Sequence, residues 1–203
     1  MCNLYRMTKN ADEVAHLFDV VAEAGSNAGG EVYPGYPGLV VAEGKVRSMA
    51  WGFPLATRGR SGQVLKPRPV TNARTDKLAG PFWHPSFERR RCLVPLEAFA
   101  EAEGPRGGKT RTWISVPGED LFTAAGIWRW SEEWGEVFSM VMTDAGASMG
   151  GVHDRMPVLL APEDRATWLA GSPGEALALC RPWPGPLTLD RTREPWAGWR
   201  AAG

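Results

Sequence analysis

The sequence predicts an α+β fold, in which a mainly antiparallel, partly closed and barrel-like β-sheet is flanked by helices. Three observations support this prediction. Only one segment carries a strong helical pattern, most other apolar runs are short and bounded by Gly or Pro, and no repeat, low-complexity tract or linker divides the chain. A chain of 203 residues is long enough for one sizeable core, so we expect a single domain over residues 1–203.

The helical pattern lies close to the N-terminus. Asn10 can cap a helix, and Glu13 follows at the spacing of a capping box. Apolar residues then recur at i, i+3, i+4 and i+7, namely Val14, Leu17, Phe18 and Val21. Gly25 predicts the end of this helix. A second helix is expected from Pro162 to about residue 170, because proline suits a first helical turn.

The strand-like runs fall into pairs and single segments. Residues 39–42 and 45–51 flank a Glu43-Gly44 turn, and residues 111–116 and 121–128 flank a Pro117-Gly118 turn. Further strands are expected at residues 92–100, 136–143 and 156–160. Residues 54–69, rich in Gly, Pro and basic side chains, are predicted as an exposed mobile loop. The segment after residue 181 is predicted to wrap the surface.

Charge is unevenly distributed along a chain whose formal net charge is zero. Residues 57–111 hold twelve Lys or Arg and five Asp or Glu, a local charge of +7, so the remainder carries −7. The zero net charge argues against global electrostatic attraction to nucleic acid. The basic segment can still form a polyanion-binding face, although solvated loop charges are an equally good interpretation.

Several classes of protein are disfavoured. No apolar run approaches the length of a membrane span, and we expect neither a secretory leader nor a membrane partner. The three cysteines and three histidines have no metal-ligand spacing, so no metal or organic cofactor is expected. Unpaired cysteines suit a reducing compartment, which predicts a cytoplasmic protein.

Cys2 is the most informative residue. An initiator Met before so small a residue is readily removed, which would leave a cysteine with a free thiol and a free α-amine. Reference pKa values of about 8.5 and about 8 make both groups partly nucleophilic at neutral pH. Such a pair can attack one aldehyde twice, or act in N-terminal nucleophile hydrolysis. From its position alone, Cys2 is equally well a small buried residue at the start of a strand.

Further motifs accompany Cys2 in a fixed order. They are Trp51-Gly52, Asn72-Ala73-Arg74, the run Arg91-Cys92-Leu93-Val94-Pro95 with Glu101 shortly after it, and His153-Asp154-Arg155-Met156-Pro157. Over residues 2 to about 160 this set resembles the SOS response-associated peptidase family, whose members form covalent crosslinks to abasic sites in DNA. Each motif alone is weakly specific, whereas the combination is strongly specific.

The resemblance implies catalytic roles for Cys2, Asn72, Glu101 and His153. The Cys2 amine would form a Schiff base with the aldehyde of an opened abasic sugar, and the thiol would then close a thiazolidine ring. Glu101 would transfer protons, although Glu97 or Glu103 could be mistaken for it. His153 would assist ring opening, and Asn72 would orient the amine or the sugar. Lyase activity through the Schiff base is also implied.

The resemblance also implies that the partner is single-stranded DNA with abasic sites. Arg74 and Arg155 would bind phosphate, and Trp51 would stack on exposed bases, with a core position for Trp51 as the alternative. Arg58, Arg60, Lys66 and Arg68 would follow the DNA backbone. The protein is expected to be a monomer that joins the nucleoid during DNA damage.

The chain departs from the family pattern at two places. Asn3-Leu4 replaces the usual Gly-Arg after the cysteine, with Arg6 further on, and Ala100 and Ala102 replace aromatic residues beside Glu101. Two other functions use the same sequence features. The first is a cysteine peptidase with Cys2 as nucleophile and autocatalytic removal of Met1. The second is a non-catalytic nucleic-acid-binding module with Cys2 buried.

Overall fold

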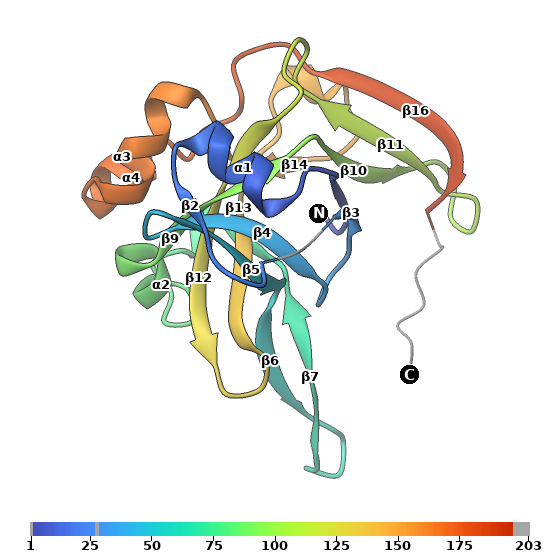
Figure 1. The fold of residues 1–203 in the computed structure, drawn as a ribbon. Helices are drawn as coiled ribbons and strands as arrows, with labels where there is room; N and C mark the ends of the chain where they lie inside the picture. The colour runs from blue at the N-terminus through green and yellow to red at the C-terminus, as the bar shows by residue number, and fades with distance from the viewer. Residues whose placement is uncertain (1, 27–28, 197–203) are drawn as a thin grey trace.

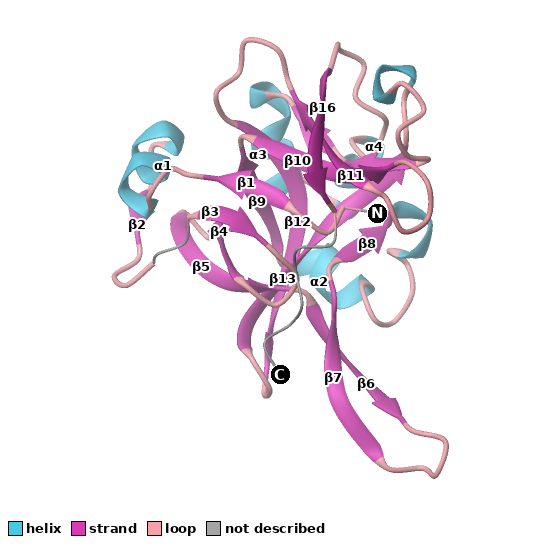
Figure 2. Cartoon of the chain, turned by 90° about the vertical axis from the view of Figure 1, so that its right-hand side faces the viewer, coloured by secondary structure: helices cyan, strands magenta, loops and turns pink. Residues whose placement is uncertain are grey.

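A β-barrel forms the centre of the molecule. The computed structural model describes residues 2–26 and 29–196. Within these residues β13, β12, β9, β4 and β5 pair in succession, and a parallel pairing of β13 with β5 closes the ring (Figures 1 and 2). The neighbouring pairs β12–β13, β12–β9, β4–β9 and β4–β5 are antiparallel. The predicted α+β fold with a mainly antiparallel, barrel-like sheet is therefore confirmed.

The barrel strands and their edge partners share one sheet. They are β2 (Val21–Ala22), β4 (Pro37–Ala42), β5 (Lys45–Trp51), β8 (Asn72–Arg74), β9 (Arg91–Leu96), β12 (Phe122–Ser131), β13 (Gly135–Asp144), β14 (Arg155–Pro157) and β15 (Leu159–Leu160). A second sheet has the order β16 (Thr188–Pro195), β11 (Thr110–Ser115), β10 (Ala98–Glu103), β1 (Tyr5–Met7) and β3 (Gly30–Val32). Only Glu97 separates β9 from β10, so the two sheets are joined directly beside the N-terminal strand.

Short helices cover the outside of the sheets in Figure 1. They are α1 (Ala11–Phe18), α2 (His84–Arg89), α3 (Arg165–Ala170) and α4 (Pro173–Ala178), with 3-10 turns η1 (Thr75–Lys77), η2 (Ala147–Met149) and η3 (Pro162–Asp164). Arg91 ties helices α2 and α3 to the barrel. Its guanidinium donates to the carbonyls of Phe87, Trp168 and Gly171.

The predicted capping box at Asn10 is present, but helix α1 is shorter than expected. It ends at Asp19, which adopts the left-handed conformation with φ 52°. Val21 leaves the helical pattern and pairs with Lys45 on the edge of β5, so its side chain is 68% exposed. Leu17 is also exposed, at 54%. Edge pairing, which suits a β-branched residue, prevails here over the helical periodicity.

The expected loop at residues 54–69 is wrong. These residues form a two-stranded hairpin of β6 (Phe53–Arg58) and β7 (Val64–Val70), which projects from the barrel in Figures 1 and 2. The segment after residue 181 does return to the surface, but as strand β16 paired with β11. The strands that flank Glu43-Gly44 pair as a hairpin, β4 with β5, and Glu43 and Gly44 have the positive φ values of a tight turn. The strands that flank Pro117-Gly118, β11 and β12, are both present but belong to different sheets.

Candidate functional site

The N-terminal strand brings Cys2 to the sheet that carries Glu101. Strand β1 runs antiparallel to β10 with Tyr5 opposite Phe99, and the Ala100 N–H donates to the Leu4 carbonyl at 2.9 Å. Antiparallel pairing advances one strand while the other runs back, so the residues before Tyr5 lie beside the half of β10 that follows Phe99. Cys2 and Glu101 are therefore neighbours through backbone pairing.

Asn72 reaches Cys2 from the barrel. It begins β8, which pairs in parallel with β13 so that Asn72 lies opposite Met140. Its Nδ2 atom donates to the Cys2 carbonyl oxygen at 2.7 Å, and both residues are buried. A residue predicted from its motif to orient Cys2 therefore contacts Cys2 directly. The site lies where the two sheets meet.

The Cys2 thiol is shielded and protonated in this state. Its side chain is fully buried, and Sγ donates to the Leu4 carbonyl at 3.6 Å. Burial raises the thiol pKa far above its usual value, and the negative charge of Glu101 raises it further. Glu101 therefore lies close enough to Cys2 to disfavour the thiolate.

Glu101 has the environment of a proton-transfer group. It is 2% exposed, and burial raises its pKa to about 7. The two carboxylates that could be mistaken for it have other partners. Glu97 accepts hydrogen bonds from the Thr8 amide and hydroxyl, and Glu103 accepts from Thr112 and pairs with Arg191 at 3.0 Å. Glu101 alone of the three is buried.

His153 and Glu101 are influenced by the same two charged side chains. The pKa of His153 is lowered mainly by burial, and Lys109 and Asp154 act on the pKa of both His153 and Glu101. The His153 Nδ1 atom accepts from the Arg155 N–H at 2.9 Å, which assigns the proton of the neutral ring to Nε2. The same Nδ1 lies 2.8 Å from Asp154 Oδ1, so a protonated ring would pair with Asp154 instead.

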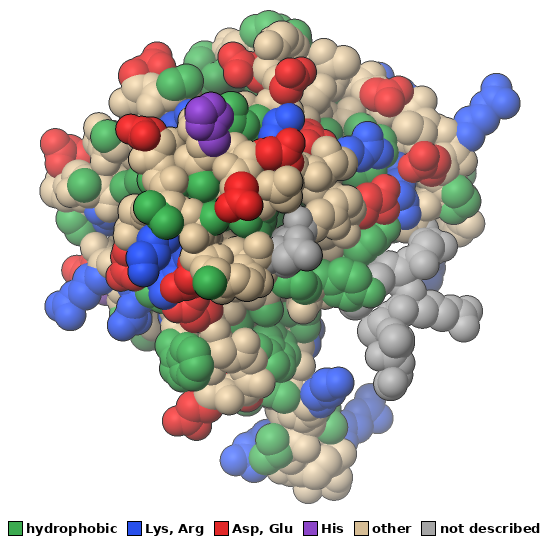
Figure 3. All heavy atoms as spheres, in the orientation of Figure 1, with side chains coloured by type: hydrophobic (Ala, Val, Ile, Leu, Met, Phe, Trp, Pro, Cys, Tyr) green, Lys and Arg blue, Asp and Glu red, His purple; other side chains and the backbone are tan. Residues whose placement is uncertain are grey.

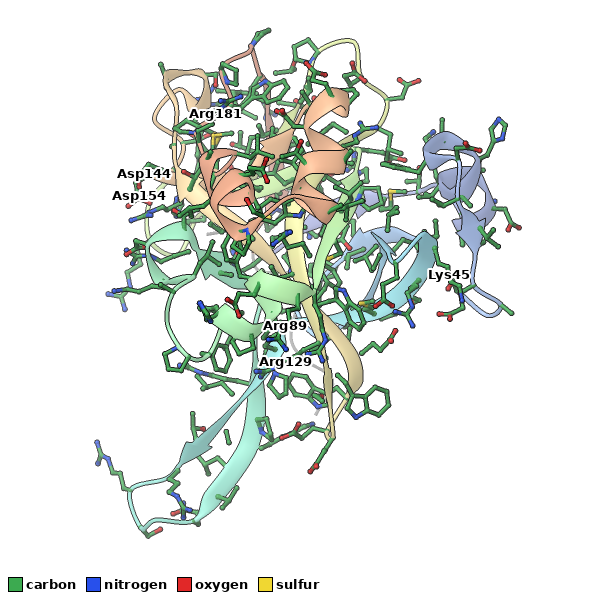
Figure 4. All side chains as sticks on the ribbon, turned by 90° about the vertical axis from the view of Figure 1, so that its left-hand side faces the viewer. Lys45, Arg89, Arg129, Asp144, Asp154 and Arg181 are labelled. Atoms are coloured by element: carbon green, nitrogen blue, oxygen red, sulfur yellow. The ribbon has the colours of Figure 1, made fainter. Side chains whose placement is uncertain are left out.

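The two predicted phosphate-binding arginines are paired with carboxylates in the free protein. Arg74 forms a bidentate pair with Asp76, at 2.9 and 2.7 Å, and the Arg155 guanidinium lies 3.0 Å from Asp144. Figure 4 labels Asp144 and Asp154 at this edge, where the Ala145 N–H donates to the Asp154 carbonyl. These carboxylate partners were not evident from the motifs, and a phosphate bound at either arginine would have to displace them.

All the charged side chains of the basic hairpin, formed by β6 and β7, are positive. Arg58, Arg60, Lys66 and Arg68 are all exposed, and residues 53–70 contain no Asp or Glu. In Figure 3 blue side chains mark this projecting end. The sequence prediction missed Arg129, which lies at the base of the hairpin in Figure 4. Its guanidinium stacks on Phe53 and Phe82 and donates to the Pro54 carbonyl.

Trp51 does not offer the expected stacking surface for bases. The side chain is fully buried, with its ring edge-to-face against Tyr5 and stacked with Phe138. Its indole Nε1 donates to the Thr71 carbonyl at 3.1 Å. Because no face of the ring reaches solvent, the core alternative applies and the stacking prediction is corrected. Arg6, which follows the departure from the family pattern at Asn3-Leu4, stacks on Trp113, with the guanidinium carbon 4.1 Å from the ring centroid.

The described part of the chain offers neither a metal cluster nor a spanning helix. Within residues 2–26 and 29–196, no three His, Cys, Asp or Glu side chains are grouped so as to hold a metal ion. Over the same residues, no helix has the length and apolar character needed to cross a bilayer.

Comparison with known proteins agrees with the motifs. The 24% identical abasic site processing protein YobE of Bacillus subtilis aligns over 188 residues, covering 83% of this chain and 82% of that protein. YoaM of the same organism, also named an abasic site processing protein, is 26% identical over 191 residues, covering 83% and 79%.

Solved structures share the fold. A protein from Bacteroides thetaiotaomicron superposes with a TM-score of 0.77 at 21% identity, covering 94% of this chain and 91% of the other. One from Bordetella bronchiseptica gives a TM-score of 0.78 at 19% identity, covering 94% and 99%. The family model described as SOS response associated peptidase (SRAP) matches residues 1–192. With its N-terminal cysteine motif, barrel and matched length, the chain belongs to the SOS response-associated peptidase family.

Proposed function

We propose that this protein processes abasic sites in single-stranded DNA by forming a covalent thiazolidine crosslink through Cys2. The observation that carries the proposal is the convergence of Cys2, Asn72 and buried Glu101, in which Asn72 holds the Cys2 carbonyl at 2.7 Å. The names of the Bacillus relatives, abasic site processing proteins, support the same substrate class.

The chemistry begins after Met1 is removed, because only then is the Cys2 nitrogen an amine. The amine adds to the aldehyde of the opened sugar, and loss of water gives a Schiff base. The thiol then adds across the carbon–nitrogen double bond, its proton passes to nitrogen, and a five-membered ring closes. The raised pKa of the thiol favours this order, since the neutral thiol is the poorer first nucleophile. In the second step the thiol is held beside the Schiff base on the same residue, and this intramolecular placement compensates for its low nucleophilicity.

Glu101 and His153 have complementary roles in this scheme. A carboxyl with a pKa of about 7 can protonate the departing hydroxyl of the carbinolamine and then accept a proton, both near neutral pH. Neutral His153 carries its proton on Nε2, so it donates a hydrogen bond to a sugar or phosphate oxygen. Neither role requires a metal-bound water.

The basic hairpin would bind the strand without reading its sequence. Four exposed cations without a neighbouring carboxylate on residues 53–70 suit phosphate contacts along a backbone. Specificity would come from the aldehyde, which intact nucleotides lack. Arg74 and Arg155 would add phosphate contacts near the lesion by exchanging Asp76 and Asp144 for phosphate.

The test is a denaturing gel of purified protein with single-stranded DNA carrying one abasic site. Mass spectrometry first confirms that Met1 is absent. Wild-type protein should give a heat-stable shifted band, whereas Cys2→Ala, Cys2→Ser and intact DNA should give none. Serine supplies a hydroxyl that cannot form the thiazolidine. Absence of the band from wild type would reject the crosslink and redirect attention to the cysteine peptidase alternative, assayed on peptide substrates.

A further inference from the structure

Asn72 is held by a second contact beside the one to Cys2. Its Nδ2 atom donates to the Cys2 carbonyl at 2.7 Å and to the Thr71 hydroxyl at 2.8 Å. A side-chain amide has two hydrogens on nitrogen, so both are used. The Oδ1 atom is buried and has no hydrogen-bond partner among the described residues. The amide is therefore oriented with its acceptor as the one atom left for another group.

The Thr71 hydroxyl can accept from Asn72 because its own hydrogen is directed elsewhere. The Oγ1 atom donates to Asn3 Oδ1 at 3.2 Å. A hydroxyl has one hydrogen and two lone pairs, so a lone pair faces Asn72. Rotating the Asn72 amide by half a turn would place its oxygen against the Cys2 carbonyl and the Thr71 lone pair. Both contacts would then be repulsive.

The Thr71 backbone is fixed from the barrel core. Its carbonyl accepts from the Trp51 indole at 3.1 Å and from the Met140 N–H at 2.9 Å, and the residue is 5% exposed. Trp51, which cannot stack on bases, thus anchors the residue that holds Asn72. A continuous set of hydrogen bonds runs from Trp51 through Thr71 and Asn72 to Cys2.

We propose that Thr71 is a positioning residue for the Cys2 reaction, with Asn3 as its acceptor. Thr71 orients the Asn72 amide so that Nδ2 holds the Cys2 carbonyl and Oδ1 stays available to accept a hydrogen from the Cys2 amine or a substrate hydroxyl. The inference rests on the proposed function, and Thr71 acts through Asn72 without contacting substrate. Asn3, a departure from the family pattern, has a defined role in this arrangement.

The test compares Thr71→Val, which keeps the side-chain shape, with Thr71→Ser, which keeps the hydroxyl. Single-turnover crosslinking is measured over a range of concentrations of abasic single-stranded DNA. Thr71→Val should lower the rate at saturating DNA by roughly 10- to 100-fold, the effect of small misplacement, and leave the half-saturating concentration within about twofold. Thr71→Ser should restore most of the rate.

A double-mutant cycle separates positioning from a general structural effect. In an Asn72→Ala background, Thr71→Val should cause no further slowing, because its partner is gone. Thr71→Val that crosslinks at the wild-type rate, or that slows Asn72→Ala by its full factor, would overturn the inference. If Thr71→Val fails to fold, Asn3→Ala takes its place, since Asn3 is exposed; slower crosslinking is then expected and an unchanged rate overturns the inference.

Failure of the proposed function is distinguishable from failure of the inference. If wild-type protein without Met1 gives no DNA crosslink, the proposed function fails. The same variants are then compared for thiazolidine formation with glyoxylate, a small aldehyde, by intact mass. Wild type and Thr71→Ser should react faster than Thr71→Val, and equal rates for all three would overturn the inference on Thr71.

Discussion

The carbonyl oxygen of Cys2 accepts a 2.7 Å hydrogen bond from the Nδ2 atom of Asn72, 70 residues away in the sequence. This bond joins the N-terminal segment, which carries the nucleophile, to strand β8 at the edge of the barrel. Because the contact is buried, removal of the donor leaves a carbonyl without a partner. The position of Cys2 therefore depends on a side chain from a different sheet.

Asn72→Asp should impair crosslinking at least as strongly as Asn72→Ala. Aspartate has the shape of asparagine but presents an acceptor to the Cys2 carbonyl, so attraction becomes repulsion. We expect both variants to lower the single-turnover crosslinking rate by about 100-fold or more. Quenched-flow or gel assays measure this rate. A fully active Asn72→Asp protein would contradict the assigned donor direction.

Glu101→Gln should remove a pH dependence of stability. The folded pKa of Glu101 is about 7, raised by burial above the unfolded value of about 4.3. Between these values the folded state holds one more proton, so stability from this group falls as pH rises through the window and is level above it. The wild-type fall that Gln abolishes is on the order of 3 kcal/mol.

Denaturant unfolding at pH values spanning this window measures the effect. Glu97→Gln is the matched control, because Glu97 is the half-exposed carboxylate that binds Thr8 on the same β9–β10 connection. The Glu97→Gln protein should show the same pH dependence of stability as wild type, because Glu101 is unchanged. An identical pH dependence in wild type and Glu101→Gln would show that Glu101 titrates in its usual range.

Neutralising the basic hairpin should weaken DNA binding without slowing the chemistry. Replacing Arg58, Arg60, Lys66 and Arg68 by Gln should reduce affinity for single-stranded DNA and lower the slope of log K against log salt by about 0.7 for each phosphate that the variant no longer neutralises. The crosslinking rate at saturating DNA should remain within about twofold. Fluorescence anisotropy at several salt concentrations measures the affinity and the salt slope.

Lys45→Gln is the control for a single basic side chain away from the hairpin. Lys45 is exposed at the start of β5 and lies far from the hairpin in Figure 4. Each of the four hairpin cations replaced singly by Gln should lower the affinity and the salt slope, whereas Lys45→Gln should change neither. Equal decreases in affinity from Lys45→Gln and from the hairpin variants would indicate a non-specific charge effect.

Asp76→Asn should strengthen DNA binding. The substitution weakens the pair that occupies Arg74 and removes a negative charge beside the proposed phosphate contact. Since both side chains are largely exposed, the gain is modest, about two- to fivefold in Kd at low salt. The same substitution in an Arg74→Gln background should give a smaller gain. Weaker binding by Asp76→Asn would reject Arg74 as a phosphate ligand.

Trp51→Phe should destabilise the fold by about 1–3 kcal/mol and leave DNA affinity unchanged. Phenylalanine keeps an aromatic ring against Tyr5 and Phe138 but has less volume and no N–H to donate to the Thr71 carbonyl. Chemical denaturation measures the loss of stability, and fluorescence anisotropy with intact single-stranded DNA measures the affinity. A stable Trp51→Phe protein with reduced DNA affinity would restore the base-stacking role.

Local patterns predicted those elements whose structure depends on neighbouring residues. The capping box at Asn10 and the Glu43-Gly44 turn are both present, because each is made by side-chain or backbone geometry within a few residues. Helix α1 ends earlier than its apolar pattern predicts, because Val21 pairs with Lys45 on the edge of β5 instead of continuing the helix. The sequence indicates a basic segment at residues 54–69. It does not indicate the hairpin, because β6 and β7 show no alternation of apolar and polar residues that would predict their pairing.

By itself the sequence determined the family motifs, the class of fold and the residue types available for aldehyde chemistry. Only the tertiary structure decided which of them meet: that Asn72 holds Cys2, that Glu101 and not Glu97 or Glu103 is buried, and that Trp51 lies in the core. The physical reason is that burial, pKa and hydrogen-bond direction depend on groups brought together from distant strands. A linear pattern specifies side chains, whereas the closed barrel and its second sheet specify their neighbours.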